Sequence, residues 1–186
     1  GAITEKTTYD DKGFILLDGK KISNFDGIGR GDVNMQVVLN ESLNTGAAFA
    51  VSKMGNDVFS KYMTNFGLGE LTGIDLPNEA KGIITNLKSP RDIEHATASF
   101  GQGIAMTPID TVRALASLAN GGTLIRPHIV TDINYTLGYS KHILPEEQRT
   151  VIKKETSEEI TRMLVEAVDT SLGGGKVKLP HYSIAA

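Results

Sequence analysis

The stretch that decides the fold reads ATASFGQGIAMTPIDTVRALASLANGG, over residues 96–122. Within it, Thr107 is a favoured N-cap residue, Pro108 suits the first position of a helix, and Asp110 favours the positive end of a helix dipole. We therefore expect a helix over residues 108–120, which the two following glycines end. Apolar side chains recur along it at helical spacing and predict a stripe along one face of the helix. The members of this stripe are Ile109, Val112, Leu115, Ala116 and Ala119.

On both sides of this stretch, apolar periodicity and turn residues predict short strands and helices in mixed order. Strands are expected at residues 14–17, within 123–135 with a break at Pro127, and at 150–152, with another beginning at Tyr182. Helices are expected at residues 32–41, 44–54, from 56 or 57 to about 66, and 156–169, with a further helix beginning at Pro90. Asp32 and Ser89 are expected as N-caps, and Gly55 as the residue that ends a helix. Three glycines at residues 173–175 predict a flexible break.

The composition excludes several classes of protein. With 186 residues, of which 40% are hydrophobic and 22% charged, the chain is an ordinary globular sequence, long enough for one domain. The formal charge of −3, without a cluster of basic and aromatic residues, excludes a nucleic-acid-binding surface. Without cysteine there is no disulfide, thiolate nucleophile or zinc–thiolate site. The histidines are far apart in sequence and form no i, i+4 pair, so no metal site is expected: His95, His128, His142 and His181.

The triplet Ser42-Leu43-Asn44, at the start of an apolar run, has two interpretations. A hydroxyl and a carboxamide two residues apart can both face one cleft, where one relays a proton and the other holds an amide. The alternative is helix capping, in which Ser42 or Asn44 accepts from the free N–H groups that open the next helix. The local sequence alone favours capping, because these residue types are strongly preferred at that position.

Residues 96–122 closely resemble the transpeptidase domain of penicillin-binding proteins of class B. The segments GIDLPNEAKG at residues 73–82 and NFDG at residues 24–27 resemble the same family. Their order and spacing around Ser42 also fit the family. The resemblance implies an α+β fold in which helices pack on an antiparallel sheet. It further implies that residues 1–186 form a partial transpeptidase domain without a second domain, truncated at both ends so that mainly the helical part and a partial sheet remain.

Penicillin-recognising enzymes place their chemistry on three motifs: S-x-x-K, S-D-N or a variant of it, and K-T-G. Ser42-Leu43-Asn44 matches the middle motif, with Leu where many members carry Asp. The chain contains no serine followed three residues later by lysine, and no Lys-Thr-Gly or Lys-Ser-Gly. In the family these two motifs would lie just before Gly1 and just after Ala186. We therefore expect them outside the chain and do not interpret it as a catalytically dead homologue.

The resemblance also implies roles for the triplet. Ser42 would pass a proton toward the leaving amine during acylation, and Asn44 would donate its side-chain NH₂ to the carbonyl of a stem peptide or the amide of a β-lactam. Leu43 should point away from substrate as packing. Without the nucleophile, the lysines and the oxyanion donors, the isolated chain should be inactive.

Two further segments have competing interpretations. Gly101-Gln102-Gly103 would lie at the wall of the cleft, with Gln102 as a weak candidate for substrate binding. Alternatively, its glycines serve a tight turn in which Gln102 bonds the backbone, and this structural interpretation is favoured. Asp75 is expected to stabilise a turn rather than act as an acid or base.

By resemblance, the parent protein is a serine D,D-transpeptidase that cross-links peptidoglycan stem peptides ending in D-Ala-D-Ala and that binds penicillin covalently. No metal or organic cofactor is implied. Proteins of the divisome or elongasome are expected partners. The expected location is the extracytoplasmic face of the bacterial membrane, with an anchor outside this chain. The alternatives are a β-lactam sensor, a D,D-carboxypeptidase or β-lactamase-type hydrolase, and a non-catalytic scaffold.

Overall fold

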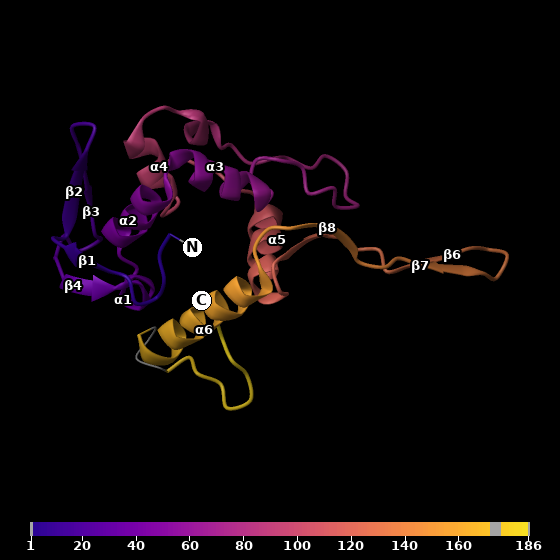
Figure 1. The fold of residues 1–186 in the computed structure, drawn as a ribbon. Coiled ribbons are helices and arrows are strands. Elements are labelled where there is room, and N and C mark those ends of the chain that lie inside the picture. The colour runs from indigo at the N-terminus through magenta and orange to yellow at the C-terminus, as the bar shows by residue number, and fades with distance from the viewer. Residues whose placement is uncertain (1, 172–175, 186) are drawn as a thin grey trace. The chain divides into compact units, whose positions relative to one another are not determined.

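The structure is a computed structural model that describes residues 2–171 and 176–185. Helices and short strands follow one another along the chain (Figure 1). The strands are β1 (Thr8–Asp11), β2 (Phe14–Leu17), β3 (Lys20–Ser23), β4 (Gly31–Asn34), β5 (Thr123–Arg126), β6 (Asp132–Asn134), β7 (Ser140–His142) and β8 (Glu146–Thr150). The helices are α1 (Met35–Asn40), α2 (Asn44–Met54), α3 (Asn56–Asn65), the 3-10 helix η1 (Thr85–Lys88), α4 (Asp92–Ala98), α5 (Pro108–Ala119) and α6 (Lys154–Thr170). This content confirms the predicted α+β class.

The strands form antiparallel pairs of two: β1 with β4, β2 with β3, β5 with β8, and β6 with β7. In the first pair, Asp11 lies opposite Gly31 and Tyr9 opposite Val33. The antiparallel pairing agrees with the prediction, but within the described residues the pairs do not join into one larger sheet. Since a two-stranded sheet is marginal in water, packing against helices decides how well each pair is held.

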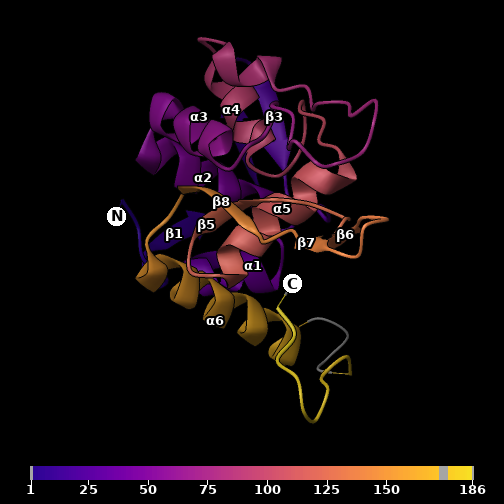
Figure 2. The same cartoon turned by 90° about the vertical axis from the view of Figure 1, so that its right-hand side faces the viewer.

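The described residues divide into two compact units, which we describe separately. The first unit takes its residues from Gly1–Lys61, Ile84–Ile104 and Glu159–Ala186. The second takes its residues from Tyr62–Ile83 and Ala105–Glu158. In the second unit, β5 lies beside α5 (Figure 2).

Two apolar clusters of the first unit meet along α2. Leu43, immediately before this helix, is 3% exposed and packs in a cluster with residues of α1 and α6. Ala48, in the second turn, packs in another cluster with residues of β3 and α4. At Gly46 an added Cβ atom would lie 2.4 Å from Cγ2 of Val38, so α1 and α2 approach too closely for any larger residue. The start of α2 is thus fixed on both sides by packing.

Helix α5 begins as the sequence predicts. Thr107 is its N-cap, and Oγ1 of Thr107 accepts from the N–H of Asp110 at 3.2 Å. In return, Oδ2 of Asp110 accepts from the N–H of Thr107 at 3.3 Å, which completes a capping box. Pro108 occupies the first turn. The predicted start and length of this helix are confirmed.

The apolar stripe of α5 is largely exposed in the part of the chain that the structure describes. Val112 is 61% exposed and Leu115 58% exposed, whereas the buried residues of the helix are Asp110, Arg113 and Ser117. The guanidinium of Arg113 donates to the carbonyl of Gly67 at 2.9 Å and to Glu70 at 3.1 Å. A buried guanidinium must be hydrogen-bonded, and Gly67 and Glu70 supply the acceptors for Arg113. The face of α5 that carries Arg113 is therefore the buried one.

Helix α1 begins later than predicted. Asp32 lies in β4 opposite Asp10 and does not cap a helix. The N-cap is Asn34, whose Oδ1 accepts from the N–H of Val37 at 3.0 Å. Because residues 31–34 pair with β1 as a strand, they cannot adopt helical dihedral angles.

Other boundaries also differ from the prediction. Helix α4 begins at Asp92, and Oγ of Ser89 accepts from the N–H of Arg91 at 3.2 Å without capping the helix. The strand expected at 150–152 is β8, which ends at Thr150. No strand was expected at β1, β3, β4 or β7, and no helix at η1. Tyr182 forms an isolated bridge with Leu179 and begins no strand within residues 182–185. The break predicted at 173–175 lies outside the described residues.

Helices 44–54 and 156–169 are confirmed as α2 and α6, and the strand at 14–17 is confirmed as β2. In the described parts of the chain, no helix combines the length and the apolar character that crossing a bilayer requires.

We expect Leu43→Ala to lower the free energy of unfolding by roughly 2–5 kcal/mol, because it opens a cavity between α1, α2 and α6. Urea denaturation of the chain measures this change. Leu137→Ala is the matched control, since Leu137 is 85% exposed and its loss should change stability by no more than about 0.5 kcal/mol. Equal losses for the two variants would contradict the packing described for Leu43.

Candidate active site

The turn between α1 and α2 carries the candidate catalytic triplet. Ser42 has a left-handed backbone conformation with φ of 52°, which costs a residue with a side chain roughly 1–2 kcal/mol. Its N–H donates to the carbonyl of Leu39 at 3.3 Å, and its side chain is exposed. Among residues 2–171 and 176–185, no group forms a hydrogen bond with the Ser42 hydroxyl. This hydroxyl is therefore available to a ligand.

Asn44 is partly buried and has only part of its amide engaged. Its Nδ2 donates to the carbonyl of Ser23, at the end of β3, at 2.9 Å. An asparagine amide has two N–H donors, so a second donor remains for another acceptor. The bond to Ser23 fixes the orientation of the amide plane.

The capping interpretation of the triplet is wrong. The N-cap of α2 is Leu43, and no side chain of the cap residue accepts from the helix. The N–H of Thr45 instead donates to Oδ1 of Asn24 at 3.2 Å. The side chain of Ser42 makes no hydrogen bond within the described residues, and that of Asn44 donates rather than accepts. Neither residue has the structural role that the local sequence favours.

Leu43 has the packing role that the sequence analysis predicts. It is buried in the cluster of α1, α2 and α6. Its N–H donates to the carbonyl of Val38 at 3.0 Å, and its carbonyl accepts from Gly46 and Ala47, both at 3.1 Å. The residue between the two candidate catalytic side chains is thus held through both its side chain and its backbone.

Gln102 lies on a separate loop of the same unit, directly after α4. Its side chain is exposed, and its backbone N–H donates to the carbonyl of Thr97 at 3.0 Å. Gly103 has φ of 80°, and a Cβ atom there would lie 2.4 Å from Nδ2 of Asn86. The glycines are therefore required by the turn, which supports the structural interpretation of this segment. Substrate binding by Gln102 stays a prediction.

Asp75 has a structural role, as predicted, but over a longer range than a local turn. Its carboxylate accepts from the N–H of Ile129 at 2.8 Å and from the N–H of Val130 at 2.9 Å. These two backbone bonds lower the pKa of Asp75, with the Val130 bond as the larger cause. The ionised carboxylate joins two distant segments of the second unit.

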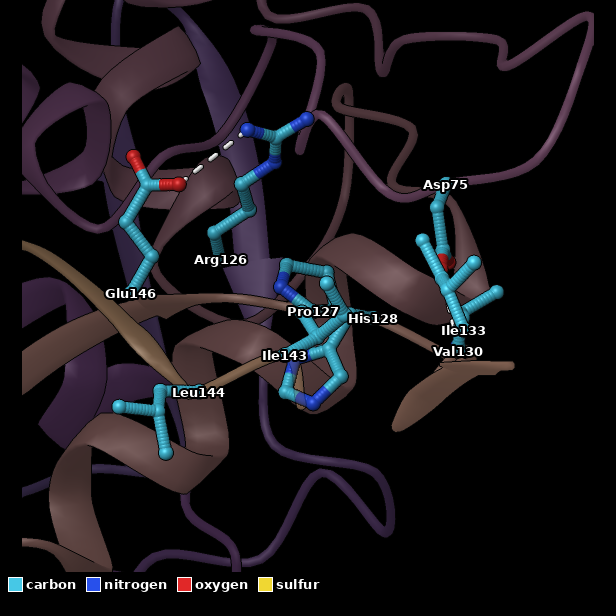
Figure 3. A pocket seen from close by; sticks show the side chains of 9 residues that line it. All are labelled: Asp75, Arg126, Pro127, His128, Val130, Ile133, Ile143, Leu144 and Glu146. Atoms are coloured by element: carbon cyan, nitrogen blue, oxygen red, sulfur yellow. Dashed lines mark hydrogen bonds and ion pairs between the residues drawn. The ribbon is translucent and has the colours of Figure 1, made fainter. Parts of the chain in front are cut away.

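A cavity of about 290 Å³ lies beside Asp75 (Figure 3). Its polar groups include the ion pair of Arg126 and Glu146, whose atoms Nη1 and Oε2 are 3.2 Å apart. Its remaining lining residues are Pro127, His128, Val130, Ile133, Ile143 and Leu144. Ser42, Asn44 and Gln102 are not among the residues that line it.

The histidines do not gather into a site. His95 is buried, with Nε2 2.8 Å from the carbonyl of Ser89 and Nδ1 3.2 Å from Oγ of Ser60. The described residues contain no group of three or more side chains arranged to hold a metal ion.

Comparison with known proteins decides the family. The family model of the penicillin binding protein transpeptidase domain matches residues 1–186. The chain belongs to this transpeptidase family. Stage V sporulation protein D of Bacillus subtilis is 33% identical over 171 residues, which are 91% of this chain and 26% of that protein. Peptidoglycan D,D-transpeptidase FtsI of Escherichia coli is 29% identical over 156 residues, 83% of this chain and 24% of that protein. The chain thus spans about a quarter of the length of these transpeptidase relatives.

Solved structures show the same fold. A peptidoglycan synthetase from Bifidobacterium adolescentis superposes with a TM-score of 0.90 at 22% identity, covering 100% of this chain and 34% of that one. Penicillin binding protein 3 from Mycobacterium tuberculosis, complexed with aztreonam, gives a TM-score of 0.82 at 22% identity, covering 92% of this chain and 38% of that one.

Sequence reasoning missed the residues that hold the triplet of this transpeptidase-family chain. Asn24 accepts a hydrogen bond from Thr45 at the start of α2, and Arg30 donates one to Glu41, the residue before Ser42. A signal for Asn24 was present, since it opens the NFDG segment that resembles the family. Sequence spacing does not reveal which distant helix an asparagine will cap.

Arg30 connects the loop after β3 with the residue that precedes Ser42. Its Nη2 donates to Asp26 at 2.8 Å, and its Nε donates to Glu41 at 2.8 Å. The bond from Arg30, followed by the backbone bond from Ile28, lowers the pKa of Asp26 from 3.8 to about 2. A carboxyl group whose pKa is lower in the folded than in the unfolded state stabilises the folded state when it is ionised. The contribution of Asp26 to the free energy of unfolding is therefore present above pH 3.8 and is lost as the pH falls through about 2.

We expect Arg30→Gln to raise the pKa of Asp26 from about 2 toward 3.8, because Arg30 is the largest cause of its depression. An NMR titration of the Asp26 carboxyl measures this value. Lys12→Gln is the control, because Lys12 lies 3.7 Å from Asp10 and should leave Asp26 unchanged. A pKa of Asp26 that stays near 2 without Arg30 would contradict the assignment.

Proposed function

We propose that this chain carries the middle catalytic motif of a serine D,D-transpeptidase that cross-links peptidoglycan, and that residues 1–186 are part of one transpeptidase domain. The observation that carries the proposal is the Ser42 hydroxyl, which is exposed, has no hydrogen-bond partner in the described chain and sits on a strained left-handed residue. Left-handed residues other than glycine cluster at functional sites. Asn44, two residues away, keeps an N–H donor for a ligand. Family membership supplies the reaction class.

In the proposed reaction, a serine of an S-x-x-K motif attacks the carbonyl carbon of the penultimate D-Ala of a stem peptide. The peptide bond to the terminal D-Ala breaks, and D-Ala leaves with a proton on its amine. An amine of a second stem peptide then attacks the acyl-serine ester and takes the acyl group, and the serine regains its proton. β-Lactams acylate the same serine, because their strained amide takes the place of the D-Ala-D-Ala bond.

The two side chains of the triplet have complementary roles in this reaction. Ser42 relays the proton toward the leaving amine, since a hydroxyl accepts and donates. Asn44 donates its free N–H to the carbonyl of the stem peptide or to the β-lactam amide, and so holds the substrate without adding charge. Gln102 is a weaker candidate for contact with substrate. The chemistry needs no metal and no organic cofactor.

The setting follows from the substrate. Peptidoglycan is assembled outside the cytoplasmic membrane, so the proposed location is the extracytoplasmic face, with an anchor beyond these residues and partners in the divisome or elongasome. The sporulation and FtsI relatives support a role in cell-wall synthesis.

We expect Ser42→Ala to slow acylation by a β-lactam by roughly 100-fold or more, because positioned acid–base groups contribute about 10²–10⁴-fold. Asn44→Ala should slow it by a similar factor through the loss of an oriented donor. Stopped-flow labelling with a fluorescent penicillin measures the rate, in the protein that carries this chain together with the expected S-x-x-K and K-T-G motifs.

Ser52→Ala is the matched control, because Ser52 is an exposed serine of α2 that donates only to the carbonyl of Phe49 at 2.7 Å. Its rate should equal that of the unchanged protein. Unchanged acylation in Ser42→Ala and Asn44→Ala would refute the assigned roles. Rapid release of hydrolysed penicillin would identify a carboxypeptidase or β-lactamase, and a stable adduct without any transfer to an acceptor amine would identify a sensor. The absence of any adduct would identify a scaffold.

The chain by itself should form no covalent adduct with fluorescent penicillin, because it contains no S-x-x-K serine. Denaturing electrophoresis followed by fluorescence imaging checks this. A labelled band at the mass of the chain would contradict the assignment of the nucleophile to a residue outside it.

A further inference from the structure

A buried polar network lies directly behind the candidate catalytic turn. Its members are far apart in sequence: Asp11 ends β1, Asn24 follows β3, and Thr45 lies in the first turn of α2. They are 2%, 4% and 1% exposed, respectively. Buried polar groups stabilise a structure only if they are paired, so the arrangement of these three residues is tightly determined.

Asp11 accepts hydrogen bonds from four residues of the first unit. Its Oδ1 accepts from the hydroxyl of Thr45 at 2.8 Å and from the N–H of Gly13 at 3.0 Å. Its Oδ2 accepts from Nδ2 of Asn24 at 2.9 Å and from the N–H of Arg30 at 3.1 Å. One carboxylate therefore gathers β1, the turn after it, the segment after β3 and the start of α2.

Asn24 connects this carboxylate with the start of α2. Its Oδ1 accepts from the backbone N–H of Thr45 at 3.2 Å and lies 2.9 Å from the Thr45 hydroxyl. The hydroxyl has a single proton, which a carboxylate attracts more strongly than an amide oxygen does. Tyr9, whose hydroxyl lies 3.1 Å from that of Thr45, supplies a further donor. Asn24 thus performs the capping that Ser42 and Asn44 do not perform.

The network adjoins the candidate catalytic residues on one side. Ser23, the neighbour of Asn24, accepts from the amide of Asn44 at 2.9 Å. Thr45, the neighbour of Asn44, is held by both Asp11 and Asn24. The end of β3 therefore sets both the direction of the Asn44 amide and the position of the backbone that follows it.

We propose that Asp11, acting through Asn24 and Thr45, is a positioning residue that sets the geometry of Ser42 and Asn44 for acyl transfer. This inference rests on the proposed function. Asp11 makes no hydrogen bond to either catalytic candidate, so it acts through the start of α2 rather than on the substrate. A displacement of about 1 Å in a catalytic group can lower a rate by about 100-fold, so the loss of one bond in this network should be visible in the rate.

The test uses an isosteric pair of variants at Thr45 in the protein that also carries the S-x-x-K and K-T-G motifs. Thr45→Val keeps the shape and removes the hydroxyl, whereas Thr45→Ser keeps the hydroxyl. The acylation rate constant at saturating fluorescent penicillin is measured together with the fraction of protein that is labelled at completion. We expect Thr45→Val to lower the rate constant about tenfold or more with complete labelling, and Thr45→Ser to restore it to within about twofold.

Complete labelling at a lower rate separates positioning from irreversible misfolding, because misfolded protein lowers the labelled fraction and leaves the rate constant of the folded molecules unchanged. A rate constant in Thr45→Val equal to that in Thr45→Ser would overturn the inference. Asp11→Asn replaces one accepting oxygen by an NH₂ group, which faces a donor and cannot accept its hydrogen bond. This variant should slow acylation as Thr45→Val does. Its effect should not add to that of Thr45→Val, because both act through one network.

Ser42→Ala, measured in parallel, distinguishes failure of this inference from failure of the proposed function. If Ser42→Ala is slow and Thr45→Val is normal, the inference alone fails. If Ser42→Ala is normal, the proposed function fails and the inference fails with it. An independent measurement uses the chain itself: amide chemical shifts of Ser42 and Asn44 should move in Thr45→Val and stay close to their original values in Thr45→Ser, and unmoved shifts would count against the inference.

Discussion

The candidate site depends on the hydrogen bonds that hold the first turn of α2. A helix start leaves backbone N–H groups without partners, and an unsatisfied buried donor costs about 1–3 kcal/mol. Here the N–H of Thr45 is satisfied by Asn24, and the Thr45 hydroxyl by Asp11. These acceptors precede Thr45 in the sequence by 21 and 34 residues. The catalytic candidates consequently acquire their geometry only when β1 and β3 are in place.

In this arrangement neither Ser42 nor Asn44 caps the helix. Because Asn24 caps the helix and Leu43 anchors the turn in the apolar cluster, the Ser42 hydroxyl needs no partner within the protein. The three residues therefore differ in what they do: Leu43 packs in the core, and Ser42 and Asn44 carry the polar groups. The left-handed backbone of Ser42 costs conformational free energy, which the packing of Leu43 against α1 and α6 offsets.

Much of the fold was predictable, because local rules act within a few residues. The capping box of Thr107 and Asp110, the glycine after α2 and the amphipathic pattern of α6 each determine an element from its own sequence. What the sequence could not show is which distant group each side chain meets. Arg113 buries its face of α5 through bonds to Gly67 and Glu70, which the periodicity of the helix does not indicate. Residues 31–34 join β1 as a strand, although Asp32 suits an N-cap.

The candidate site shows the same limit. The triplet was found by its motif, and Leu43 was correctly assigned to packing. Its local sequence nevertheless favoured capping, which is wrong because a tertiary partner, Asn24, performs it. Asp11 gave no signal for this role, since the Asp10-Asp11 pair resembles a turn until the fold brings Thr45 to it.

A structure of the β-lactam-acylated protein, with this chain and the flanking motifs present, tests the central claim most directly. The account predicts the acyl group beside the turn between α1 and α2, with Nδ2 of Asn44 about 2.7–3.2 Å from the amide oxygen of the ligand and its bond to the carbonyl of Ser23 retained. An acyl group bound elsewhere, with the amide of Asn44 and the hydroxyl of Ser42 both out of its reach, would contradict it.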